Sequence, residues 1–109
     1  MTISMYQASV PRLINGLTNL SHILGKAQAH AEAKKIDPVV FATMRLYPDM
    51  FPLSRQVQIA CDQVKNGMAR LASVEPPKFE DNETTFAQLQ DRIAKTIAFA
   101  NSLTPAQVD

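Results

Sequence analysis

The residue types that most often carry chemistry are few in this chain and stand far apart. His22 and His30 are the two histidines among 109 residues. On one helix they would lie about 12 Å apart along the axis, at about 1.5 Å per residue. Two helical histidines that share a metal ion are instead spaced four residues apart. The spacing therefore predicts surface histidines and no metal ligand.

Cys61 is the only cysteine, and its neighbours predict a buried thiol. It shares one apolar helical face with Val57, Val64 and Met68. A buried thiol without a nearby cation behaves as a small hydrophobe with a raised pKa. No histidine lies within a turn or two to act as its base, so we expect no catalytic residue here. One cysteine allows no intrachain disulfide, which fits a reducing, cytoplasmic location.

A polar stripe on a predicted helix is the one place where the sequence suggests a pocket. Polar side chains at positions 55, 58, 62 and 65 share one helical face. An apolar loop between two prolines precedes them, and in it Asp49 could cap the helix or pair with Arg55. One interpretation is a small-molecule pocket; the other, which we favour, is a solvated face with pairing between i and i+4. The candidate pocket residues are Tyr47, Asp49, Phe51, Arg55, Gln58 and Asp62.

Three acidic residues precede a predicted helix start. Glu80, Asp81 and Glu83 stand just before Thr85 and Gln88, which fit a capping box. Negative charge at a helix N-terminus is stabilising by about 0.3–1 kcal/mol per charge, and we assign the acids that structural role. A pair of catalytic carboxylates is the disfavoured alternative, because no apolar pocket surrounds them to raise a pKa.

A seam of apolar residues that repeats every seven positions predicts a long first helix. The seam runs from Ile3 to Ala31 and keeps its phase on both sides of Pro11. This favours one helix kinked near Pro11, and the alternative is a helix that starts at Ser9 with the proline in its first turn.

Further signals predict the rest of an all-α, up-down bundle with three long helices and one short helix. Asp37 and Pro38 begin a short helix that ends near Met44. A second long helix covers about 53–72, and a third follows Thr85 until Thr104 and Pro105, which could open another helix. No strand pattern with period two persists. We expect the apolar loop 47–53 to fold back between the first two long helices as a structural plug.

Charge and hydropathy disfavour several classes of partner. The chain has 11 basic and 10 acidic residues, with a formal net charge of +1. It has no basic stripe with interleaved aromatics, so we expect no nucleic-acid partner. The longest early uncharged window, 13–25, is too short and polar to span a bilayer. We predict one domain, 1–109, and no membrane association.

Several segments, in order along the chain, resemble a known bacterial family. They are 5–7, 48–53, 55–60, 84–87 and 92–96. The sequence is similar to a family of domains of unknown function within the DinB/YfiT-like superfamily, which includes metal-dependent enzymes. The stretch Pro-Asp-Met-Phe-Pro-Leu at 48–53 is the most specific part of the resemblance. The resemblance implies a four-helix bundle that is often a homodimer.

This sequence differs from the family that it resembles in two ways. Members of the family continue beyond the equivalent of Asp109 with a turn-rich segment and a fourth long helix, so we expect the domain to be incomplete at its C-terminal end. The metal-binding branches use three histidines, one on the second long helix and two on the fourth. No histidine lies on the second long helix here, so we assign no metal ligand and predict no cofactor.

Three hypotheses of function follow. The first is a bundle protein, non-catalytic or with a degenerate metal site, that self-associates to close the side a fourth helix would cover. The second is a metal-dependent thiol transferase or hydrolase whose ligands come from a missing segment or a partner chain. The third is a small-molecule binding module that uses the candidate pocket.

Overall fold

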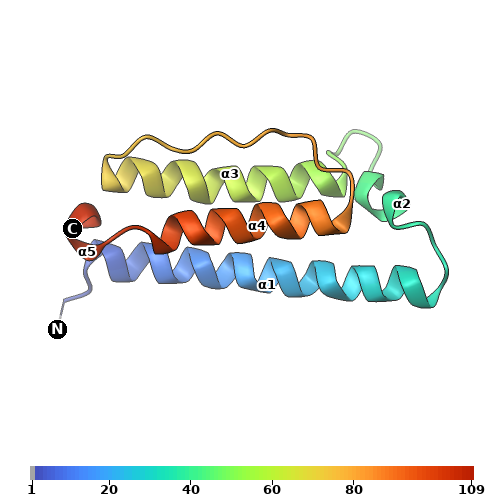
Figure 1. Cartoon of the computed structure of the whole chain (residues 1–109), viewed down its shortest axis with the longest axis horizontal. Coiled ribbons are helices and arrows are strands. Elements are labelled where there is room, and N and C mark those ends of the chain that lie inside the picture. The colour runs from blue at the N-terminus through green and yellow to red at the C-terminus, as the bar shows by residue number, and fades with distance from the viewer. Residues whose placement is uncertain (1) are drawn as a thin grey trace.

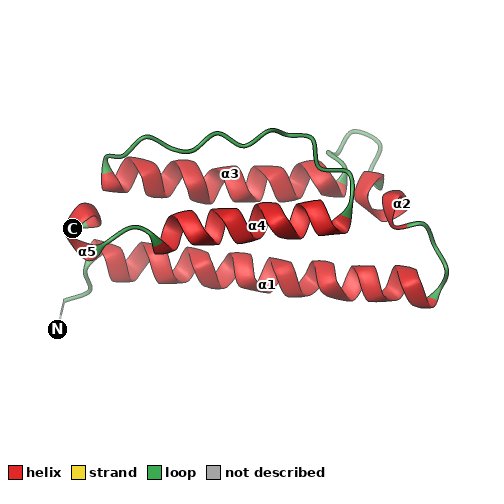
Figure 2. Ribbon diagram, viewed as in Figure 1, coloured by secondary structure: helices red, strands yellow, loops and turns green. Residues whose placement is uncertain are grey.

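Helices make up the regular structure of residues 2–109, the part of the chain that a computed structural model describes (Figure 2). They are α1 (Met5–Ala33), α2 (Pro38–Thr43), α3 (Leu53–Ala72), α4 (Phe86–Asn101) and α5 (Pro105–Val108). No strand occurs in these residues. The prediction of an all-α bundle with three long helices and one short helix is confirmed, and α5 is the further helix that Thr104 and Pro105 could open.

The first long helix is continuous and includes Pro11. The Ser4 hydroxyl accepts a hydrogen bond from the Gln7 amide at 3.1 Å, and the Gln7 side chain accepts one from the Ser4 amide at 3.3 Å. This capping box fixes the start of α1, so the alternative start at Ser9 is wrong. Ile3, predicted as the first residue of the seam, precedes the helix and is 78% exposed, so the prediction is wrong for this residue. The fully buried seam residues are Val10, Leu17, Leu24 and Ala31.

The other helix boundaries also follow local signals. The Asp37 carboxylate accepts a hydrogen bond from the Val39 amide at 3.1 Å and begins α2. The Thr85 hydroxyl accepts one from the Gln88 amide at 3.2 Å and begins α4. At the end of α3, Ser73 adopts a left-handed conformation with φ 54°, which stops the helix. These start and stop positions agree with the predicted ones.

The connection between α3 and α4 sets the topology. Residues 73–85, here called the strap, run back along the whole of α3 (Figure 1). As a result α4 runs parallel to α3 and antiparallel to α1, which differs from a simple up-down succession (Figure 1). Because α3 and α4 are parallel and packed together, the strap can lay side chains over the groove between them.

The core forms where α4 packs against both α1 and α3. The apolar faces predicted for the three long helices point into it, except for Ile3 and for Leu71, which was expected on the face of the second long helix. Leu71 is 38% exposed, and Ala72 is buried in its place, because Ala72 lies four residues after the buried Met68 and so continues its stripe. The largest fully buried aliphatic and aromatic side chains are Val10, Leu24, Val57, Met68, Phe86, Leu89 and Ile93.

The apolar loop after α2 is exposed, so its prediction as a plug between the first two long helices is wrong. Tyr47 is 65% exposed and Phe51 is 57% exposed. The physical reason is that α4 packs against both α1 and α3. Local hydrogen bonds hold the loop instead: Arg45 donates to the Met50 carbonyl at 2.9 Å, and Gln56 donates to the Phe51 carbonyl at 3.1 Å.

Within residues 2–109, no helix is long and apolar enough to cross a membrane.

Candidate functional site

A buried guanidinium lies where α3, α4 and the strap meet. Arg92 on α4 is 2% exposed. Its Nη2 atom donates to Asp62 Oδ1 on α3 at 2.8 Å, and its Nη1 atom donates to Glu83 Oε1 on the strap at 2.8 Å. A buried charge is tolerated only when it is paired and hydrogen-bonded. This arginine therefore ties three segments of the chain together.

The strap supplies most of the oxygen atoms around this arginine. Arg92 Nη1 also donates to the Glu80 carbonyl at 3.1 Å and lies 2.8 Å from Asp81 Oδ1. Gln58 on α3 donates to the second oxygen of Glu83 at 3.0 Å. The Glu83 side chain is 8% exposed. The strap is thus held by charge-assisted hydrogen bonds, which are stronger than neutral ones.

Two more cations complete the group. Arg55 Nη1 lies 3.1 Å from Asp81 Oδ2, and Lys65 Nζ lies 3.4 Å from Asp62 Oδ1. The Phe79 ring of the strap covers this region: Lys65 Nζ lies 5.2 Å and Arg92 Cζ 5.9 Å from its centroid, within cation–π range. We call the six charged residues the charge cluster: Arg55, Asp62, Lys65, Asp81, Glu83 and Arg92.

The electrostatics of the cluster keep Arg92 charged. Burial of the guanidinium opposes its charge, but the hydrogen bonds to Glu83 and Asp62 outweigh burial and raise the pKa of Arg92. Its Nε atom is buried and has no hydrogen-bond partner among residues 2–109. Three oxygen atoms lie around Nη1, those of the Glu80 carbonyl, Asp81 and Glu83, although this atom carries only two hydrogens. The Nε hydrogen makes no hydrogen bond within residues 2–109.

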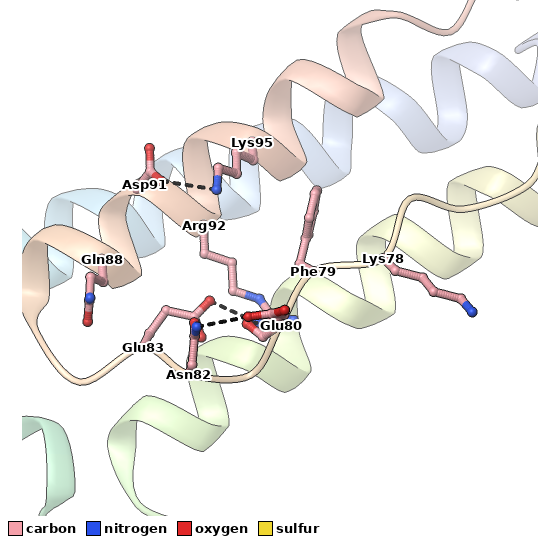
Figure 3. A pocket seen from close by; sticks show the side chains of 9 residues that line it. All are labelled: Lys78, Phe79, Glu80, Asn82, Glu83, Gln88, Asp91, Arg92 and Lys95. Atoms are coloured by element: carbon pink, nitrogen blue, oxygen red, sulfur yellow. Dashed lines mark hydrogen bonds and ion pairs between the residues drawn. The ribbon is translucent and has the colours of Figure 1, made fainter.

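A hollow of about 380 Å³ opens beside the cluster, between α4 and the strap (Figure 3). Gln88, Asp91 and Lys95 of α4 form one wall. Asp91 and Lys95 pair with each other at 3.3 Å. The hollow is of the size that small-molecule sites have, although it is more polar than most. Residues of the strap that form the opposite wall include Phe79, Glu80, Asn82 and Glu83.

The predicted burial of Cys61 is confirmed. The residue is 0% exposed. Burial raises the pKa of the Cys61 thiol, and a hydrogen bond with Thr96 on α4 lowers it in part. The thiol lies between α3 and α4, one residue before Asp62 of the charge cluster.

Both histidines are exposed, as predicted. The His30 ring packs edge-on against Phe41 of α2, with 5.9 Å between ring centroids. Among residues 2–109, no three His, Cys, Asp or Glu side chains are grouped so as to hold a metal ion.

The six candidate pocket residues do not form one site. Arg55 and Asp62 belong to the charge cluster, and Gln58 is buried beside it. Phe51 lies under Arg55, with 5.9 Å from the guanidinium carbon to the ring centroid. Asp49 lies with Phe51 at a separate depression lined also by Ile59 and Ala60. Tyr47 is an exposed loop residue.

Neither role considered for Asp49 is observed. Arg55 pairs with Asp81 of the strap, and α3 begins after Pro52 without a side-chain cap. Two of the acids that were expected to stabilise the start of α4, Asp81 and Glu83, surround Arg92 instead, and the first turn of α4 contains no acidic residue.

Sequence reasoning missed Arg92, the centre of the cluster. One signal was available: Arg92 lies between Leu89 and Ile93, inside the apolar stripe of α4. A charge on a buried stripe requires a partner of opposite charge. The sequence alone does not say which of ten acidic residues that is.

Comparisons with known proteins agree with this architecture. A family model described as a domain of unknown function, DUF1993, matches residues 5–109. The crystal structure of a DinB family member from Shewanella denitrificans is similar, with 43% sequence identity and a TM-score of 0.90. The match covers 94% of this chain and 59% of that one, so the chain spans about three-fifths of that protein's length. No curated protein matches the chain. The chain therefore belongs to the DUF1993 family of domains of unknown function and has the DinB-like fold.

Proposed function

We propose that this protein acts by association with a second copy of itself, through an apolar surface at one end of the bundle. The observation that supports the proposal is the concentration of exposed apolar side chains on α2 and the loop after it. We call these residues the end patch: Val39, Val40, Met44, Leu46, Tyr47, Met50 and Phe51.

The end patch gathers seven exposed apolar side chains within one short segment of the chain. Single exposed apolar residues are normal on a protein surface, whereas a group of them marks an interaction site. Leu46 is 86% exposed, and the other members are between 36% and 65% exposed. They lie at the end of the bundle opposite the C-terminus (Figure 1). Burial of such a surface would give about 25 cal/mol per Å² of apolar area.

The charges within the patch favour a second copy as the partner. Arg45 and Asp49 are the charged residues of segment 39–51, one of each sign. In a two-fold symmetric contact the same patch faces itself, so Arg45 of each copy can meet Asp49 of the other copy. A surface that carries one cation and one anion amid apolar residues is suited to this arrangement.

Replacement of patch residues tests the proposal. Leu46→Ser with Phe51→Ser removes two exposed apolar side chains without disturbing the core. We expect this double variant to elute as a monomer where the wild type elutes as a dimer, with unchanged helical circular dichroism. Ile23→Ser is a matched control, because Ile23 is 61% exposed on α1 away from the patch. A double variant that associates as the wild type does would contradict the proposal.

Small-molecule binding beside Arg92 is the second candidate function. It is favoured by the hollow of about 380 Å³ and by the buried Nε atom that lacks a partner. A ligand that binds only the native state must raise the melting temperature. A thermal-shift screen that includes carboxylates, phosphates and amines is the test, and the absence of any saturable shift counts against this candidate.

Other predictions from the sequence stay predictions. They are a cytoplasmic location, a further C-terminal helix, and metal-dependent thiol chemistry with ligands from outside residues 1–109. Metal analysis after metal-supplemented expression would test the last of these.

A further inference from the structure

We propose that the place of Asp81, between the guanidinium groups of Arg55 and Arg92, is a binding site for a small organic carboxylate. The carboxylate of Asp81, which belongs to the strap, then competes with the ligand for that site. The inference rests on the second candidate function, small-molecule binding beside Arg92, and adds the ligand class and the position. It shares Phe51 with the end patch but does not depend on association through that patch.

The helices alone leave an excess of positive charge at this place. Four residues of the charge cluster lie on α3 and α4: the cations Arg55, Lys65 and Arg92, and the carboxylate Asp62. Three cations less one carboxylate leaves a formal charge of +2 on these four residues. Because Arg92 is buried, anions must lie beside it, and the strap supplies two of them.

Asp81 is the more weakly held of the two strap carboxylates. The Glu83 side chain is 8% exposed and accepts hydrogen bonds from both Arg92 and Gln58. The Asp81 side chain is 46% exposed and accepts a hydrogen bond from Arg55. Its 2.8 Å contact with Arg92 Nη1 is an ion pair, because that atom donates to the Glu80 carbonyl and to Glu83.

The surroundings of Asp81 fit a carboxylate that carries an apolar group. Two guanidinium groups meet one carboxylate there, the pairing for which arginine is best suited. The ring of Phe51 lies beside Arg55, and the ring of Phe79 lies beside Arg92, each 5.9 Å from the guanidinium carbon. Figure 3 shows Phe79 and Glu83 converging with Arg92 at the strap. An incoming carboxylate that displaces Asp81 would place its apolar part near these rings.

The test removes the competitor. Asp81→Asn keeps the size of the side chain and removes its charge, and benzoate is the probe, titrated calorimetrically at constant ionic strength. We expect benzoate to bind this variant about tenfold more tightly than the wild type, because an intramolecular competitor at high effective concentration is gone. Adding Arg55→Gln should abolish the gain. Asp91→Asn is the control, since Asp91 carries the same charge at the rim of the hollow.

Each outcome decides the matter. A folded Asp81→Asn protein that binds benzoate no better than Asp91→Asn overturns the proposal and leaves Asp81 as a structural tie. Tighter binding of inorganic phosphate than of benzoate overturns the assignment of ligand class. If Asp81→Asn does not fold, the wild type is titrated instead: a saturable response to benzoate that Arg55→Gln removes supports the site, and no such response overturns it.

Discussion

Arg92 of α4 and Asp62 of α3 form an ion pair of 2.8 Å in which the arginine side chain is 2% exposed. The pair joins two parallel helices whose connection, the strap, crosses over the same arginine. The same buried arginine binds Asp62 of α3 and Glu83 of the strap. The stability of the helix pair therefore depends on the strap.

Replacement of Arg92 by methionine should destabilise the fold strongly. The variant nearly keeps the volume of the side chain but leaves Glu83 without its cation and Asp62 with Lys65 alone, and breaking a buried pair in this way typically costs about 3–5 kcal/mol. Urea denaturation measures the free energy of unfolding. Lys95→Met is the control, because its pair with Asp91 is exposed and should contribute about 0.5 kcal/mol or less. Equal losses in the two variants would contradict this role for Arg92.

Neutralisation of Glu83 should loosen the strap. Glu83→Gln removes the charge that pairs with Arg92 while keeping the side chain's length, so we expect residues 73–85 to open more often. Trypsin reports the opening, because Lys78 is the cleavable residue within the strap. Cleavage there should accelerate in Glu83→Gln but not in Glu80→Gln, whose side chain accepts a hydrogen bond from Asn82 alone among the described contacts. Identical cleavage rates would show that the ion pair does not hold the strap.

The apolar stripe of α4 should contribute more to stability than exposed apolar residues do. Ile93 is 1% exposed, and Ile23 on α1 is 61% exposed. We expect Ile93→Ala to lower the free energy of unfolding by about 2–5 kcal/mol and Ile23→Ala to change it by about 0.5 kcal/mol or less. Chemical denaturation of both variants checks the difference. A large loss in Ile23→Ala would mean that α1 packs on another surface.

Cys61 should make the fold less stable in alkali. Burial raises the pKa of this thiol above 9.0, so the unfolded chain loses its proton at lower pH than the native chain does. Stability from this group is therefore complete below the unfolded pKa and declines as the pH rises through it. Urea denaturation between about pH 7.5 and pH 9.5 should show a steeper loss in the wild type than in Cys61→Ala. Parallel pH profiles would contradict the burial of a neutral thiol.

The helices could be predicted because their signals are local. Thr85 and Gln88 lie three residues apart and satisfy each other's backbone donors, and Asp37 with Pro38 begins a helix by the same kind of local chemistry. The seam from Val10 to Ala31 reflects the helical period alone. None of these features depends on which helix packs against which.

The charge cluster and the exposed loop depend on packing, and local signals do not contain them. Asp62 and Arg92 meet because the strap makes α3 and α4 parallel. No local sequence pattern predicts the direction of one helix relative to the other. Phe51 stays exposed because α4, much later in the chain, packs against both α1 and α3. The sequence stripe did place Arg55 and Asp62 on one face, but Arg55 pairs with Asp81 of the strap and Asp62 pairs with Arg92 of α4, both much later in the chain.

Sedimentation equilibrium of the wild-type chain tests the central proposal, association through the end patch, most directly. Protein is examined over a range from about 1 to 100 μM, where weak and strong dimers both dissociate measurably. We predict a reversible monomer–dimer equilibrium with an average mass that rises from the 12.0 kDa of one chain towards twice that value. A folded protein that stays at 12.0 kDa throughout this range would contradict the account.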